Sequence, residues 1–184
     1  MRGGLAVAVS AVIGAGVLTG APAVAAPACA VPALPGAVLV ATVFDMGAMM
    51  GPGMMGPGMM GGGPMMGSPM MGMMRLSVDP ATVRTGTVSL LVRNVGARDH
   101  EVVVLPLAAG QSVGWRTINS DNRIDETGSL GEVSSSCGSG EDEGVAPGSV
   151  GWTTLTLAPG RYELVCNLAG HYAAGMYAEL DAHA

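Results

Sequence analysis

The chain has 184 residues and a formal net charge of −6, and only 12% of its residues are charged. Phosphate binding requires clustered basic residues, whereas the basic residues here are dispersed arginines, so a nucleic-acid-binding protein is excluded. Of its fifteen methionines, most lie between Met46 and Met74, and the positive mean hydropathy therefore does not indicate a membrane protein.

The N-terminal residues 1–26 have the pattern of a secretory signal peptide. Arg2 precedes an apolar run over 5–18, and Ala23 to Ala26 provide an A-x-A cleavage site. The run is shorter than the roughly 20 residues of a spanning helix. We therefore expect an exported protein, whether periplasmic, cell-surface or secreted, with no transmembrane span in the mature chain. An uncleaved anchor and lipidation of Cys29 are the alternatives.

A Pro- and Ala-rich linker over 27–36 precedes a predicted domain over 37–184. The β-branched run 37–44 is the first predicted strand. An insertion rich in Met, Gly and Pro follows over 45–74 and has a near-repeat of five residues, which is typical of a loop without regular structure. Further strands are predicted over 75–79, 87–94, 100–105, 113–118, 152–157, 161–166 and 176–182, and a long surface connection over 120–148. This spacing predicts an all-β, Greek-key antiparallel β-sandwich of about seven or eight strands.

One short segment carries three soft metal donors. Cys166, His171 and Met176 follow one another with the spacing C-x4-H-x4-M, so a single loop can direct a thiolate, an imidazole and a thioether to one point. A thiolate, two imidazoles and a weak axial thioether form the trigonal site of a copper ion that cycles between two oxidation states. The pattern therefore predicts copper, with a second imidazole supplied from elsewhere.

Only His100 and His183 remain to supply that imidazole. His183 is the penultimate residue, where chains are commonly poorly ordered, whereas His100 begins an apolar strand. We therefore expect His100 to complete the site. Zinc is disfavoured because such sites contain more Cys or His. A Cys166 nucleophile is disfavoured because no third group orients His171 as its base.

At these residues the chain resembles a cupredoxin, a small blue copper protein, and the loop spacing is similar to that of rusticyanin-like and sulfocyanin-like members. The resemblance implies one type 1 copper on His100, Cys166, His171 and Met176. It also implies one-electron transfer through the edge of His171 with a redox protein as donor and another as acceptor. The protein would be a monomeric electron carrier rather than an enzyme. A catalytic oxidase or reductase centre would require histidines that the chain lacks.

The family resemblance extends to structural details around the ligands. Tyr162 resembles a tyrosine corner, whose hydroxyl bonds back to nearby backbone. Many cupredoxins carry Asn or Ser after the first ligand histidine, where this chain has Glu101. Asn94 is the candidate for a similar bridging role between the two ligand segments. Apolar residues of the loop, including Leu168 and Tyr172, are expected to form a small docking patch around His171.

The methionine-rich insertion supports a second hypothesis, that of a copper delivery or storage protein. Thioethers bind Cu(I) and do not protonate, so paired methionines could hold additional Cu(I). A soft contact surface for a redox partner and a tolerated low-complexity expansion are the other interpretations. Copper stoichiometry distinguishes a carrier of several ions from an electron-transfer protein with one.

The long connection contains half of the acidic residues. They are Asp121, Asp125, Glu126, Glu132, Glu141, Asp142 and Glu143. Such a run is commonly a solvated face, and the alternative is a docking patch for a basic partner. Cys137 lies in the same connection among Ser and Gly residues. Its one upstream partner is Cys29, and a disulfide between them is an open alternative.

Overall fold

The protein is described by a computed structural model over residues 29–45, 74–139 and 142–184. These residues form strands and loops without a helix, so none of the described segments is a helix able to span a membrane. The strands are β1 (Ala37–Asp45), β2 (Met74–Asp79), β3 (Thr82–Arg84), β4 (Gly86–Asn94), β5 (Val102–Leu107), β6 (Gly131–Val133), β7 (Val150–Leu157), β8 (Gly160–Val165) and β9 (Tyr177–His183). The predicted signal peptide and nearly all of the methionine-rich insertion lie outside the described residues.

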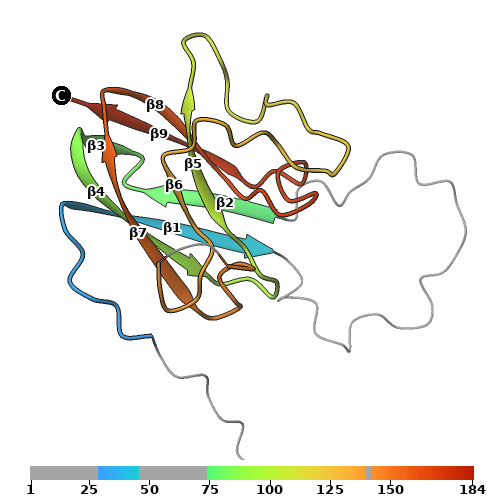
Figure 1. Ribbon diagram of the computed structural model, residues 1–184, viewed down its shortest axis with the longest axis horizontal. Coiled ribbons are helices and arrows are strands. Elements are labelled where there is room, and N and C mark those ends of the chain that lie inside the picture. Colours follow the sequence, from blue (N-terminus) through green and yellow to red (C-terminus); the bar gives the residue numbers. More distant parts are fainter. Residues whose placement is uncertain (1–28, 46–73, 140–141) are drawn as a thin grey trace, which may run out of the picture.

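Two sheets pack face to face (Figure 1). One has the order β2-β1-β4-β7 and the other β3-β9-β8-β5-β6. The expected all-β sandwich is thus confirmed. Most strand pairs are antiparallel, as in the predicted sandwich, and two pairs are parallel, β1 with β4 and β3 with β9. The three-residue strands β3 and β6 were not predicted. The predicted strand over 113–118 contributes only an isolated bridge between Ile118 and Ile124.

The core lies between the sheets and follows from strand alternation. Successive side chains of a strand point to opposite faces, and β1 accordingly buries Leu39, Ala41 and Val43, while the residues between them are only half-buried. The inward residues of β4, β5, β8 and β9 join the same cluster. Full burial of each such Leu or Val stabilises the fold by about 1.5–3 kcal/mol. A shift of one residue would turn these side chains to the other face, so their burial fixes the register of every strand that leads to the site.

The long connection between β5 and β7 covers the outer face of the second sheet. Ile124 of this connection packs on Val103, Leu105 and Val165 in a second apolar cluster. The carboxylate of Glu163, fully buried on β8, accepts hydrogen bonds from the Gly114 amide at 2.6 Å and from Arg116 Nε at 2.7 Å. The connection is therefore held on the sheet by apolar contact and a buried ion pair.

The acidic residues of the connection bond mainly within their own turns. Asp121 accepts a hydrogen bond from the Arg123 amide and Asp125 from the Thr127 amide, while Glu132 accepts one from the Ser134 hydroxyl. These contacts give the acidic residues a local structural role. The docking patch stays a prediction, and Glu141 lies outside the described residues.

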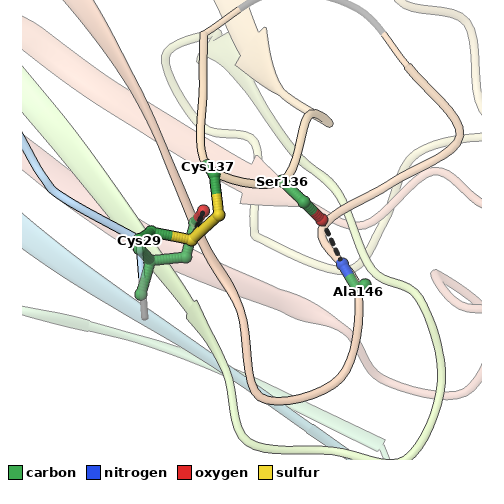
Figure 2. The surroundings of a disulfide bond; sticks show 5 residues. Cys29, Ser136, Cys137 and Ala146 are labelled. Carbon is green, nitrogen blue, oxygen red and sulfur yellow. Dashed lines mark hydrogen bonds between the residues drawn. A yellow bond between two sulfur atoms is a disulfide. The ribbon is translucent and has the colours of Figure 1, made fainter. Parts of the chain in front are cut away.

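A disulfide joins Cys29 to Cys137, with their Cα atoms 5.0 Å apart. Figure 2 shows that it ties the N-terminal segment to the connection that follows β6, where Ser136 Oγ accepts a hydrogen bond from the Ala146 amide at 2.8 Å. Cys29 is thereby occupied, which is inconsistent with its lipidation. The tyrosine corner is present as expected, because the Tyr162 hydroxyl donates to the Ala158 carbonyl at 2.8 Å.

Candidate metal centre

At one end of the sandwich, the inward-facing rows of four strands lead to polar residues or predicted metal ligands. In β1 the row Leu39, Ala41, Val43 ends in Asp45, and in the adjacent β4 the row ends in Asn94, which pairs with Val43. In the other sheet, Cys166 follows the inward row of β8. His100 precedes β5 by two residues and so continues its inward row. Strand alternation alone therefore brings donors from distant parts of the sequence to one place.

Three of the four predicted ligands form a compact buried triangle. Nδ1 of His100 lies 3.2 Å from Nδ1 of His171, and Cys166 Sγ lies 3.3 Å from Nδ1 of His171 and 3.9 Å from Nδ1 of His100. The ligand atoms of the three residues all lie within 4.8 Å of one another, and this is the one grouping of His, Cys, Asp or Glu with metal-site geometry found among the described residues.

The ring of His100 is oriented by a carboxylate. Its Nε2 lies 3.0 Å from Asp45 Oδ2, and both side chains are buried. Burial lowers the pKa of His100, although the neighbouring Asp45 acts in the opposite direction. The ring is therefore neutral, and because a carboxylate oxygen only accepts, the single proton resides on Nε2. The lone pair of Nδ1 is left facing Cys166 and His171.

His171 faces the same point from the ligand loop. Burial, followed by the proximity of His100, lowers its pKa to about 4. The ring is neutral at physiological pH and can offer a lone pair to a metal. Its exposed fraction is 9%, whereas His100, Cys166 and Met176 are each at 0%. Among the predicted ligands, His171 is thus the one that reaches the surface.

The thiol of Cys166 is fully buried, and burial raises its pKa to about 12. Without a metal the group is therefore a neutral thiol, and a metal ion would have to displace its proton to bind the thiolate. The Glu101 amide donates to the sulfur at 3.5 Å. This backbone contact, made by the residue directly after His100, links the two segments that carry the predicted ligands.

Met176 is fully buried in the same apolar cluster as Cys166. Its main chain closes the ligand loop, because its carbonyl accepts from the Cys166 amide at 3.0 Å and its amide donates to the His171 carbonyl at 3.2 Å. These bonds hold the residue beside the triangle. Its role as the axial ligand stays a prediction.

The donor set fits copper. Metal–nitrogen and metal–sulfur bonds of about 2.0–2.3 Å place the donors of a trigonal site roughly 3.5–4 Å apart, close to the separations of the three residues. One thiolate and two imidazoles in a buried pocket beside a methionine are the ligands of a blue-copper site. The remaining histidine, His183, is exposed at the end of β9 and pairs with Arg84. The structure thus brings His100 to the site in preference to His183.

The structure gives Asn94 a role that differs from the predicted one. Asn94 does not bridge the two ligand segments: its side-chain amide donates to the carbonyls of Arg98 at 2.6 Å and Val145 at 2.7 Å. It therefore braces the segment carrying His100 against the long connection.

Tyr172 was expected on a docking patch but is buried at 2% exposure, where its hydroxyl donates to Glu163 at 2.9 Å. Leu168 is only half-buried and remains at the surface.

Asp45 and Val145 are contributions that the sequence analysis missed. Val145 pairs with His100 through both backbone groups, at 2.7 and 3.2 Å. Nothing in the sequence indicates that contact. For Asp45 the sequence did contain a signal. It lies at an inward-facing position of a strand whose other inward-facing residues are apolar. A carboxylate at such a position requires a polar partner.

No protein-family model and no curated protein matches the chain. Solved structures do. A dithionite-reduced auracyanin from Roseiflexus castenholzii is 24% identical, with a TM-score of 0.42 over 59% of this chain and 88% of its own. Auracyanin A, a "blue" copper protein from Chloroflexus aurantiacus, is 18% identical, with a TM-score of 0.40 over 59% and 89%. Reduced rusticyanin is 16% identical, with a TM-score of 0.39 over 81% of both chains. The likeness is too distant to carry an argument about function, which therefore rests on the site.

Proposed function

We propose that this protein is an exported electron carrier that holds one type 1 copper ion on His100, Cys166, His171 and Met176. The observation that carries the proposal is the buried triangle of one thiol and two imidazoles, in which both rings turn Nδ1 toward the sulfur. When bound, copper would supply reversible one-electron chemistry.

The residues of the chain perform the remaining work. Burial excludes water from the donors, and the backbone bonds of Met176 and Val145 hold both ligand segments in place. A site held rigidly needs little rearrangement when its charge changes by one. Electron exchange with a redox protein would pass through the edge of His171, the predicted ligand with surface exposure. We expect the carrier to be monomeric.

The disulfide supports export. Bonds of this kind persist in oxidising compartments and are rare in the cytosol, and the Cys29–Cys137 bond joins a residue just beyond the predicted signal to the folded domain. Cleavage after residue 26 would retain Cys29. Mass spectrometry of the mature protein tests this: an N-terminus beyond Cys29 would contradict the assignment.

The copper site is tested by adding Cu(II) to the apoprotein and recording the visible spectrum. An intense blue colour that saturates at one copper per chain is expected. Cys166→Ser should remove the colour, because the thiolate is its source. His100→Gln should weaken copper binding, whereas His183→Gln is the matched control at an exposed position and should not. A colourless complex, or a Cys166→Ser variant as blue as the parent, overturns the proposal.

A second candidate function, copper delivery or storage, is favoured by the position of one methionine. Met74, the last methionine of the insertion, lines a groove together with Ala174 and Gly175 of the ligand loop. The methionine-rich segment thus ends beside the proposed copper site. Anaerobic titration of the full chain with Cu(I) separates the two functions. A delivery or storage protein should hold several Cu(I) ions per chain, and an electron carrier only one.

A further inference from the structure

The carboxylate of Asp45 is an unusual group to find at the inward end of β1. The inward residues that precede it are apolar, and Asp45 itself is 2% exposed. Burying a carboxylate is costly unless hydrogen bonds compensate for the lost water. Those partners should therefore identify the purpose of Asp45.

A single oxygen of Asp45 receives three donors. The amide of Ala97 lies 2.8 Å from Oδ2, that of Arg98 lies 3.1 Å from it, and Nε2 of His100 lies 3.0 Å from it. All three come from the segment that carries the copper-binding histidine. Bonds to a charged acceptor are roughly twice as strong as neutral ones, so Asp45 holds both the backbone of this segment and the ring at its end.

The segment approaches Asp45 too closely to admit a side chain at its nearest point. A Cβ atom added at Gly96 would overlap Asp45 Oδ2 and would also meet the amide of Asp45 and Nε2 of His100. The glycine allows the backbone to close over the carboxylate. The pair formed by Asp45 and His100 is therefore enclosed by protein.

We propose that Asp45 is a positioning residue that fixes the His100 ring with Nδ1 toward the copper and favours the oxidised metal, and so sets the reduction potential. This inference rests on the proposed function. An imidazole that donates to a carboxylate is held in one tautomer and is a more basic ligand. A more basic ligand stabilises Cu(II) more than Cu(I), so the carboxylate should lower the reduction potential.

The chain offers a well-matched pair of variants. Asp45→Asn retains a carbonyl oxygen that the three donors can reach but removes the charge. Asp99→Asn removes the same charge from the exposed residue next to His100, which makes no hydrogen bond to the ring in the structure. A difference between the two variants therefore reports the contact of Asp45 with the ring rather than the net charge around it.

The measurements are Cu(II) and Cu(I) affinity and the reduction potential of the copper-loaded chain. Loss of an outer hydrogen-bond partner typically lowers metal affinity by about 10–100-fold. We expect Asp45→Asn to lower Cu(II) affinity about tenfold more than Cu(I) affinity, which raises the potential by about 59 mV for a one-electron couple. Asp99→Asn should change the ratio by less than about twofold. Equal potentials in the two variants overturn the inference.

A metal-free measurement separates this inference from the proposed function. Nitrogen NMR of the wild-type apoprotein should show the proton of His100 on Nε2, and a proton on Nδ1 overturns the role of Asp45 even if Asp45→Asn fails to fold. A wild-type protein that stays colourless with copper would instead overturn the proposed function, whatever the tautomer of His100.

Discussion

The two segments that carry the predicted ligands are held in different ways. The loop from Cys166 to Met176 is closed by its own backbone, with amide–carbonyl bonds from His171 to Leu168 at 2.9 Å and from Gly175 to Tyr172 at 3.0 Å. The segment over 94–101 has little such local closure. Asp45 from β1 and Val145 from the long connection hold it instead. One half of the site is thus encoded locally and the other depends on the whole fold.

The largest test of this difference removes the disulfide. In Cys29→Ser/Cys137→Ser the loss of a crosslink across 108 residues should lower the free energy of unfolding by about 4–5 kcal/mol, since a closed loop of that length restricts the unfolded chain. Urea denaturation of the apoprotein measures it. The segment around His100 is held by the long connection, which the disulfide anchors. Its amides should therefore lose hydrogen-exchange protection before those of the loop from Cys166 to Met176. A decrease in the free energy of unfolding of less than about 1 kcal/mol, or an equal loss of hydrogen-exchange protection in both segments, would contradict the comparison.

Asn94→Ala removes side-chain hydrogen bonds that hold the segment around His100, two within the segment and one to the long connection. It removes two donors to the Arg98 and Val145 carbonyls and the acceptor of the Gly96 amide. The Val145 carbonyl keeps the His100 amide as a donor, whereas the Gly96 amide and the Arg98 carbonyl lose the contact with Asn94. Each buried group left without a partner costs about 1–3 kcal/mol, so we expect a loss of about 3 kcal/mol. Copper affinity should fall too, because His100 is displaced. The control is Asn119→Ala at an exposed position, and similar losses in both variants would refute the role of Asn94.

Glu101 gives the segment a pH dependence. Burial, with smaller contributions from Glu132 and Glu126, raises its pKa from 4.5 to about 7, and Oε1 has no hydrogen-bond partner among the described residues. The folded apoprotein therefore binds this proton more tightly than the unfolded chain. Its stability should fall by about 3 kcal/mol as the pH rises from 4.5 to 7.

Glu101→Gln should remove this pH dependence and should be more stable than the parent at pH 8, since no charge is then buried. Urea denaturation of both apoproteins at about pH 5 and pH 8 provides the measurement. Parallel pH profiles in the two proteins would show that Glu101 is not the group responsible.

The smallest effect is expected in the locally closed loop. Gly170 has φ of 84° and open space around its Cα, so Gly170→Ala should cost about 1–2 kcal/mol of left-handed strain without disturbing the ligands. Gly128→Ala, at φ of 87° with similar space, is the matched control and should cost as much. If Gly170→Ala loses the blue colour and Gly128→Ala keeps it, the backbone bonds of the loop are not enough to hold the predicted ligands in place.

The same difference explains what the sequence could predict. The spacing of Cys166, His171 and Met176 is visible in eleven consecutive residues, and the strand that begins just after His100 was evident from its apolar run. The supports of His100 were not predictable in this way. Asp45 and Val145 lie 55 and 45 positions from it, and their contacts depend on the parallel pairing of β1 with β4 and on the course of the long connection.

The bond between Cys29 and Cys137 also makes a covalent ring. The ring encloses Asp45, the methionine-rich insertion and His100, and leaves Cys166, His171 and Met176 outside. A single cut by a protease anywhere in the insertion would therefore open the ring without releasing a fragment. The nicked chain would remain one disulfide-linked molecule whose two pieces separate only after reduction, so a clipped preparation would keep Asp45 together with the four predicted ligands, which all lie C-terminal to the insertion.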